Sequence, residues 1–268
     1  MKKKSIAVFD SGIGGLTVVH EIIRLLPNEN IIYFGDCGRT PYGNRSKDTV
    51  LKYTFQNIRF LLSMDIKMIV IACNTASACS FEKVRHELGI PVVEVVKPGA
   101  LAAIKKTKNR KVGIIGTKAT IDSAVYQKTL NEIDNSVKVV SKACPLFVPL
   151  VEEGWWENEV TYKTIEEYLT PIKNEGIDTL VFGCTHYPLL CNPIKKFIGE
   201  EVNYINSAEE VAKLVKLELD KNGIRSDLSA NPICRFFTSD SVEKFNHLSS
   251  IIMDGQIVEA EKVNIEEF

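Results

Sequence analysis

Short apolar runs rich in β-branched residues alternate with longer segments of mixed character along the chain. Most of the runs are apolar at consecutive positions rather than at every second position, which is typical of parallel strands covered on both faces. Strands are predicted at residues 5–10, 30–36, 68–73, 91–96, 111–117, 137–142 and 178–184. The segments between them carry helical spacing, most clearly at 46–64 and 161–174. This alternation predicts an α/β fold with mainly parallel sheets.

The two halves of the chain repeat one plan. The run ending at Asp10 opens into a turn of small residues and precedes Cys73, and the run ending at Thr117 precedes Cys184 at a similar spacing. We interpret this echo as two similar α/β lobes, each offering a cysteine from a strand end. Ligands of open α/β sheets bind beyond the carboxyl ends of the strands, so the active site is expected in the cleft between the lobes.

Beyond residue 205 only one element is distinct. Residues 207–223 form an amphipathic pattern, with Ser207 and Glu210 spaced as a capping box and Gly223 suited to end the helix. The rest of the tail gives no clear pattern.

The composition excludes several classes of protein. With 268 residues and 45% hydrophobic content, the chain can bury a large core. The 33 basic and 34 acidic residues leave a net charge of −1, which gives no reason to expect a nucleic-acid or membrane partner. No apolar run approaches the roughly 18 residues that span a bilayer, and the basic cluster at residues 2–4 lacks the apolar region of a signal peptide. A globular cytoplasmic protein is predicted.

The seven cysteines are scattered, and none forms a C-x-x-C pair, which argues against a disulfide framework and a structural zinc site. Cys73 and Cys184 each end an apolar run and precede small polar residues. A helix beginning there, with Asn74 and Thr75 as caps on the Cys73 side, would bind a carboxylate and stabilise a thiolate through its free N–H groups. Four others are expected as ordinary core residues: Cys79, Cys144, Cys191 and Cys234. Cys37, in a loop, stays open.

Other motifs leave alternatives open. His186 could join Cys184 in a metal site or a nucleophilic pair, or could simply be a hydrogen-bonded histidine; no further metal ligands are regularly spaced nearby. The glycines of residues 10–15 fit neither a dinucleotide fingerprint nor a P-loop, so a tight turn that faces Asp10 and Ser11 to a ligand is expected. Residues 41–43 form either a plain turn or one that presents backbone N–H groups. His20, His86 and His247 are expected on helices.

Five stretches together carry a family resemblance: FDSGIGGLTV, YFGDCGRTPYG, IACNTASA, CPLFVPLVEEG and FGCTHYPLL. Together they resemble the glutamate racemases of the aspartate/glutamate racemase superfamily, from about residue 5 to residue 205. The resemblance implies that one thiolate removes the Cα proton while the other thiol protonates the opposite face. Cys73 would act on D-glutamate with help from Asp10. Cys184 would act on L-glutamate with help from His186 and Glu152.

The resemblance also implies the remaining features of the site and the chain. Substrate contacts would come from Asp10, Ser11, Pro41, Tyr42, Gly43, Asn74, Thr75, Thr185 and His186. The first lobe would be discontinuous, with residues 1–97 and 206–268, and the second would span residues 98–205. We expect no cofactor and no metal, glutamate as substrate, a homodimer, and D-glutamate supplied for peptidoglycan, cell-wall biogenesis and cell shape.

Two departures and two alternatives accompany the resemblance. The family more often has Thr or Ser where Cys37 stands, which puts a side-chain contact there in doubt. The chain starts at the first strand, without the N-terminal extension of members activated by a cell-wall precursor, so no such activation is expected. A sister racemase acting on aspartate or another small acid is the alternative function, and a non-catalytic amino-acid-binding protein is a third, which the joint presence of Cys73 and Cys184 disfavours.

Overall fold

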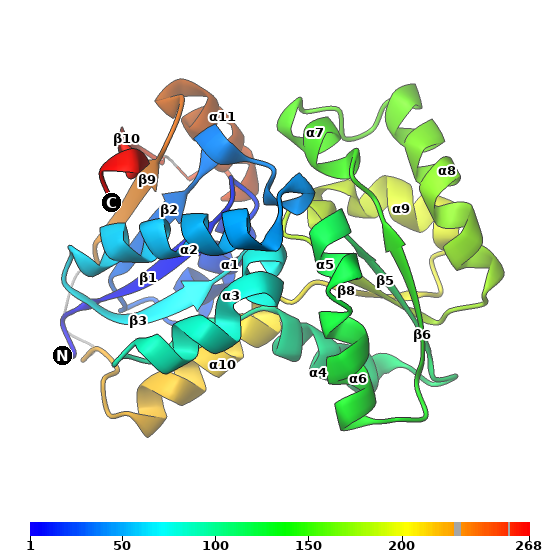
Figure 1. The fold of residues 1–268 in the computed structure, drawn as a ribbon. Coiled ribbons are helices and arrows are strands. Elements are labelled where there is room, and N and C mark those ends of the chain that lie inside the picture. Colours follow the sequence, from blue (N-terminus) through cyan, green and yellow to red (C-terminus); the bar gives the residue numbers. More distant parts are fainter. Residues whose placement is uncertain (228–231, 257) are drawn as a thin grey trace. The chain divides into compact units, whose positions relative to one another are not determined.

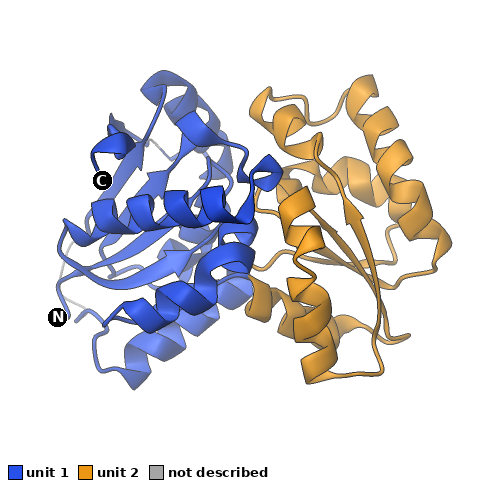
Figure 2. Ribbon diagram, viewed as in Figure 1, with its two compact units in different colours: residues 1–95, 208–268 blue, residues 96–207 orange. Residues whose placement is uncertain are grey.

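The computed structural model describes residues 1–227, 232–256 and 258–268. The chain divides into two compact units, which are coloured separately in Figure 2. Unit 1 contains residues 1–95 and 208–268, and unit 2 contains residues 96–207. Each unit is built on one sheet whose described strand pairs are all parallel, which confirms the predicted fold class.

The sheet of unit 1 has the strand order β10-β9-β2-β1-β3-β4. Its strands are Ser5–Asp10 (β1), Ile31–Gly35 (β2), Ile66–Ile71 (β3), Val92–Glu94 (β4), Cys234–Thr238 (β9) and Ala260–Lys262 (β10). Its α-helices are Leu16–Leu25 (α1), Lys47–Leu62 (α2), Asn74–Glu87 (α3), Ala208–Lys221 (α10) and Val242–Ile252 (α11). Its 3₁₀ turns are Cys37–Arg39 (η1), Tyr42–Asn44 (η2) and Ile265–Glu267 (η4).

Helices cover both faces of this sheet (Figure 1). α2 and α3 pack against each other on one face, while α1 and α10 pack together on the other. Successive strand residues point to opposite faces, so Ala7 and Phe9 of β1 join Ile69 and Ile71 of β3 in the core beneath α2 and α3. Burial on both faces explains why these strands read as continuous apolar runs.

The sheet of unit 2 has the strand order β6-β5-β7-β8. Its strands are Lys111–Gly116 (β5), Lys138–Ala143 (β6), Thr179–Gly183 (β7) and Asn203–Ile205 (β8). Its helices are Val96–Lys106 (α4), Lys118–Asp122 (α5), Val125–Ile133 (α6), Phe147–Glu152 (α7), Glu159–Asn174 (α8) and Cys191–Ile198 (α9), with the 3₁₀ turn Tyr187–Leu190 (η3). One core lies against α4 and α6, and another lies against α7, α8 and α9.

The strand orders confirm the internal echo. The order β2-β1-β3-β4 of unit 1 has the same connectivity as β6-β5-β7-β8 of unit 2. In this match β3, which precedes Cys73, corresponds to β7, which precedes Cys184. Each cysteine therefore follows the strand that occupies the same place in its own sheet.

The tail contains more structure than its sequence indicates. Beyond α10, residues 234–238 and 260–262 extend the sheet of unit 1 as β9 and β10, joined through α11. The predicted helix end is confirmed, because Gly223 has φ +64 and the Ile224 N–H donates to the Leu219 carbonyl at 3.0 Å. His20, His86 and His247 lie on helices, as predicted.

Candidate functional site

In unit 1, a tight turn follows β1 and holds Asp10 in place. Asp10 is fully buried, and its Oδ2 accepts the N–H groups of Gly12 at 3.2 Å and Gly15 at 3.1 Å. The Tyr33 hydroxyl donates to the Gly12 carbonyl at 2.7 Å. A Cβ on Gly15 would lie 2.5 Å from the Asp10 Cβ and 2.9 Å from the Tyr33 Oη. Residue 15 must therefore be glycine for the turn to fold over Asp10.

Cys73 lies at the positive end of α3. It occupies the N-cap position with an extended backbone, and its sulfur accepts the Ala76 N–H at 3.4 Å. The thiol also donates to the Ser11 Oγ at 3.5 Å. The prediction that Asn74 and Thr75 cap this helix is wrong: they are the first two helical residues, because the chain turns at Cys73 itself. The partial positive charge at the N-terminus of α3 therefore lies directly beside the Cys73 sulfur.

The loop after β2 carries Pro41, Tyr42 and Gly43. The 3₁₀ turn η2 packs against α3, and the Tyr42 ring shares a buried cluster with Cys73. The Tyr42 hydroxyl donates to the Asp36 Oδ2 and accepts the Asn57 Nδ2–H at 3.0 Å. Burial first, and then the neighbouring Asp36 carboxylate, raises the pKa of Tyr42 well above its usual value. Because this hydroxyl is already engaged, a ligand at the turn would meet backbone rather than the phenol.

In unit 2, Cys184 directly follows β7 and lies beside an imidazole. The Cys184 Sγ is 3.9 Å from the His186 Nδ1, and the His186 Nε2 is 2.8 Å from an oxygen of Glu152, the last residue of α7. His186 is buried, which opposes its charge, but contacts with Cys184 and Glu152 outweigh burial and raise its pKa well above 6.5. The raised pKa favours the protonated imidazole, which lies between a sulfur and a carboxylate.

The expectation of a helix N-terminus after Cys184 is wrong. The residues that follow form the 3₁₀ turn η3, which has Pro188 near its start, and α9 begins only at Cys191. A 3₁₀ turn this short aligns few peptide dipoles. The imidazole of His186 takes the place beside this thiol that helix α3 takes beside Cys73.

The register of unit 2 points to two residues that the sequence analysis did not single out as site residues. Gly116 of β5 pairs with Gly183 of β7, so the next residues, Thr117 and Cys184, stand side by side at the sheet edge. In unit 1 the register Phe9 with Ile71 gives Ser11 the same place beside Cys73. The hydroxyls of Thr117 and Thr120 lie 3.0 Å apart and are buried. The echo was a signal for Thr117, although it matched Thr117 with Asp10 rather than with Ser11.

Three of the remaining cysteines behave as ordinary core residues. Cys144 is buried, Cys79 and Cys191 are half-buried, and burial raises the pKa of each of these thiols. Cys234 was predicted in the core but is exposed, because β10 pairs with β9 only from Phe236 onward. Cys37 is half-buried in η1.

The predicted site residues thus form two groups. Unit 1 holds Asp10, Ser11, Pro41, Tyr42, Gly43, Cys73, Asn74 and Thr75, and unit 2 holds Glu152, Cys184, Thr185 and His186. In residues 1–227, 232–256 and 258–268, no three His, Cys, Asp or Glu side chains cluster as metal ligands would. Within the same residues, no helix has the length and apolar character needed to cross a membrane.

Comparison with known proteins identifies the family. The Asp/Glu/Hydantoin racemase family model matches residues 36–215. The chain is 46% identical to a glutamate racemase of Geobacter metallireducens, across 99% of this chain and 98% of that protein.

Solved structures agree with the sequence comparison. The crystal structure of glutamate racemase isoform RacE1 from Bacillus anthracis superposes with a TM-score of 0.94 at 45% identity, covering 98% of both chains. The glutamate racemase of Francisella tularensis, crystallised with D-glutamate, gives a TM-score of 0.93 at 34% identity over the whole of both chains. The chain belongs to the Asp/Glu/Hydantoin racemase family, in which it groups with the glutamate racemases as an amino-acid racemase.

Proposed function

We propose that this racemase interconverts L-glutamate and D-glutamate without a cofactor, by a two-base mechanism. The observation that carries the proposal is the pair of cysteines at matching strand ends, each with a different polar partner. Cα has two faces, and inversion requires a proton to leave from one and to arrive at the other. Two thiols, one from each unit, supply that pair of groups.

Cys73 is the proposed base for D-glutamate. The partial positive charge at the start of α3 favours a thiolate there, and the Cys73 thiol donates a hydrogen bond to the Ser11 Oγ at 3.5 Å. The Asp10 carboxylate is fixed by its own turn, so it can accept or orient a proton on this side. We propose substrate contacts from Ser11, Asn74 and Thr75, and from the backbone of residues 41–43.

Cys184 is the proposed base for L-glutamate. The raised pKa of its partner His186 favours the protonated imidazole, which can give a proton to the sulfur and, once neutral, take one back. Glu152 keeps the imidazole oriented and charged through the Nε2 contact. Thr185 and His186 are the proposed substrate contacts on this side.

The difficult step is the ionisation of a weak carbon acid. As the Cα proton leaves, negative charge grows on the α-carboxylate. Hydrogen-bond donors that are already aimed at the carboxylate stabilise that charge without further reorganisation. We therefore assign most of the rate enhancement to these donors and to the placement of the two sulfurs.

The wider role follows from the product. We propose that the protein acts in the cytoplasm as a homodimer and supplies D-glutamate for peptidoglycan, and thereby for cell-wall biogenesis and cell shape. A racemase acting on aspartate or another small acid is the competing function, and a panel of acidic amino acids with chiral detection separates the two.

Isotope incorporation in D₂O tests the mechanism. Starting from L-glutamate with no added cofactor, the D-glutamate formed first should carry deuterium at Cα while the remaining L-glutamate stays protiated. Deuterium appearing equally in both enantiomers from the start would contradict two separate bases. In Cys184→Ala, D-glutamate should still exchange its Cα proton without inversion, and in Cys73→Ala, L-glutamate should do so. The opposite pattern would reverse the assignment of the thiols.

A further inference from the structure

A polar network behind the turn at residues 41–43 centres on Arg39. The Nε of Arg39 donates to the Asp36 Oδ2 at 2.7 Å, and its Nη2 donates to the Asn57 Oδ1 at 3.0 Å. Its Nη1 donates to the Gln56 Oε1 at 2.6 Å and to the Glu266 Oε1 at 3.2 Å. The Arg39 side chain is 10% exposed. A guanidinium so completely bonded fixes the relative positions of four other side chains.

The network reaches the turn through Asp36. This carboxylate is fully buried, and its Oδ2 accepts from both Arg39 and the Tyr42 hydroxyl. Asn57 closes the ring, because it accepts from Arg39 and donates to the Tyr42 hydroxyl at 3.0 Å. The Tyr42 hydroxyl and the Asp36 Oδ2 are therefore both tied to the position of the Arg39 guanidinium.

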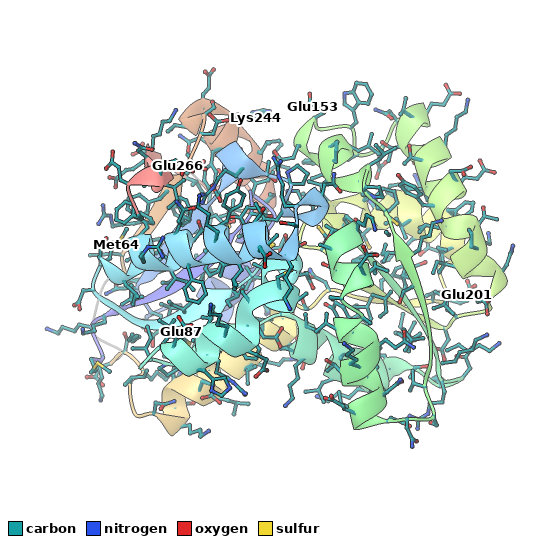
Figure 3. All side chains as sticks on the ribbon, in the orientation of Figure 1. Met64, Glu87, Glu153, Glu201, Lys244 and Glu266 are labelled. Atoms are coloured by element: carbon teal, nitrogen blue, oxygen red, sulfur yellow. The ribbon has the colours of Figure 1, made fainter. Side chains whose placement is uncertain are left out.

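The C-terminal segment completes the network. The Ser239 hydroxyl donates to the Asp36 Oδ1 at 2.8 Å and accepts the Gly38 N–H at 2.9 Å. Glu266, which Figure 3 labels on η4, contacts the Arg39 Nη1 and accepts from Gln56 at 3.4 Å. The η4 turn packs against α2, which carries Gln56. Residues far apart in the sequence thus converge on one arginine.

We propose that Arg39 is a positioning residue for racemisation, which acts through Asp36 and Tyr42 to hold the backbone of residues 41–43 where the substrate binds. This inference rests on the proposed function, which assigns that backbone to the substrate. In this role Arg39 and the Tyr42 hydroxyl act through their bonds within the protein and not by contact with the substrate. Removing Arg39 should therefore weaken substrate binding more than it slows the proton transfers at the two thiols.

A lysine cannot replace this arginine. The planar guanidinium donates in four directions at once and lies 4.1 Å from the centre of the Tyr53 ring, whereas an ammonium is a compact charge without that fork. A surface hollow of about 590 Å³ borders Arg39, Ser239 and Glu266. Free guanidinium can therefore reach the space that a shortened side chain leaves.

The experiment compares Arg39→Ala, Arg39→Lys and Tyr42→Phe with the wild type. The readouts are kcat and KM in both directions, D-glutamate affinity by calorimetry, and thermal unfolding. Arg39→Ala should raise KM about tenfold or more with a smaller fall in kcat, and millimolar guanidinium should restore KM. Arg39→Lys should not restore it. Tyr42→Phe, which leaves no cavity, should raise KM in the same direction to a smaller extent.

Arg235→Ala is the matched control, because Arg235 pairs with Glu261 at 3.0 Å in the same C-terminal segment but is absent from the network. Its KM should match the wild type. Unchanged KM in Arg39→Ala and Tyr42→Phe would overturn the positioning role while the wild-type activity stands. If Arg39→Ala does not fold, Tyr42→Phe alone decides. A wild type that neither binds nor racemises glutamate would instead overturn the proposed function, and this inference with it.

Discussion

In unit 1 the Cys73 thiol caps an α-helix and bonds a serine hydroxyl, whereas in unit 2 the Cys184 thiol lies beside a buried imidazole backed by a carboxylate. Four strands of each sheet share one connectivity, so each sulfur follows the corresponding strand of its own sheet. The groups around them differ: fixed backbone dipoles on one side, and a titrating side chain on the other. Two sheets with the same connectivity can therefore hold thiols whose protonation responds differently to pH.

The largest expected effect tests whether both sides are needed. Cys73→Ala and Cys184→Ala should each reduce racemisation by about 10³-fold or more, because each thiol serves a different face of Cα. Optical rotation with circular-dichroism checks of folding measures this. Cys191→Ala is the control, since that half-buried cysteine belongs to neither group. Near-normal turnover in either of the first two variants, correctly folded, would show that one thiol suffices.

The next effect separates the helpers of the two thiols. Asp10→Asn and His186→Asn should each slow turnover by about 10- to 10³-fold, with different pH profiles and unequal effects on kcat in the two directions. The enantiomers have equal free energy, so kcat/KM must stay equal in both directions and KM must compensate. Full progress curves from each enantiomer across pH give the comparison. Identical profiles for the two variants would mean that neither residue is tied to one thiol.

A smaller effect concerns the charge on His186. Its raised pKa means that the imidazolium persists to higher pH than that of an ordinary histidine and is lost as the pH rises through that pKa. Glu152→Gln removes the one carboxylate that, together with Cys184, raises the pKa of His186. The alkaline limb of kcat/KM should therefore move to lower pH by about one unit. The exposed neighbour Glu153, labelled in Figure 3, supplies the control Glu153→Gln, which should leave the limb in place. A limb that does not move in Glu152→Gln would separate Glu152 from this titration.

The tight turn of unit 1 gives a test that acts through packing. Gly15→Ala places a Cβ against Asp10 and Tyr33 and should cost about 1–3 kcal/mol of unfolding free energy. It should also slow Cα exchange of D-glutamate more than that of L-glutamate. Gly89→Ala, where a Cβ would meet nothing within 4 Å, is the matched control. Equal stability of the two variants in denaturant titrations would show that the turn tolerates the extra methyl group.

The last prediction is that a metal chelator and a carbonyl reagent have no effect on activity. EDTA and hydroxylamine should leave racemisation unchanged, because the described residues offer no cluster of metal ligands and the sequence no evident pyridoxal phosphate site. Activity is followed before and after dialysis with each reagent. Loss that metal or pyridoxal phosphate then restores would contradict a cofactor-free mechanism.

The parts of the fold that the sequence predicts are those in which neighbouring residues carry the signal. All seven predicted strands form, although β6 lies at a sheet edge and contains no buried residue. β10 was not predicted because Ala-Glu-Lys is an edge strand with little burial, and β8 has only three residues. Pattern reasoning from this sequence does not detect strands that depend on pairing with distant segments.

In the candidate site, too, the sequence predicts what a local motif carries and does not predict contacts between distant segments. The sequence indicates Cys73, Cys184 and His186 because each stands in a local motif, while Glu152 entered only through the family resemblance. Arg39 and Glu266 are 227 residues apart, and their contact leaves no trace in either local sequence. That Cys73 caps its own helix depends on the backbone angle at one residue, which the sequence does not determine.

The division of unit 1 into two segments affects the order in which the two sheets can be completed during synthesis. Residues 96–207 are contiguous, so all four strands of their sheet have been synthesised once residue 205 leaves the ribosome. β2, by contrast, has no neighbour on its outer side until β9 at residues 234–238 has been made. Until then its unpaired edge is open to pairing with other chains. The nascent protein thus carries an aggregation-prone edge through the synthesis of more than half its length, and the last segment removes it.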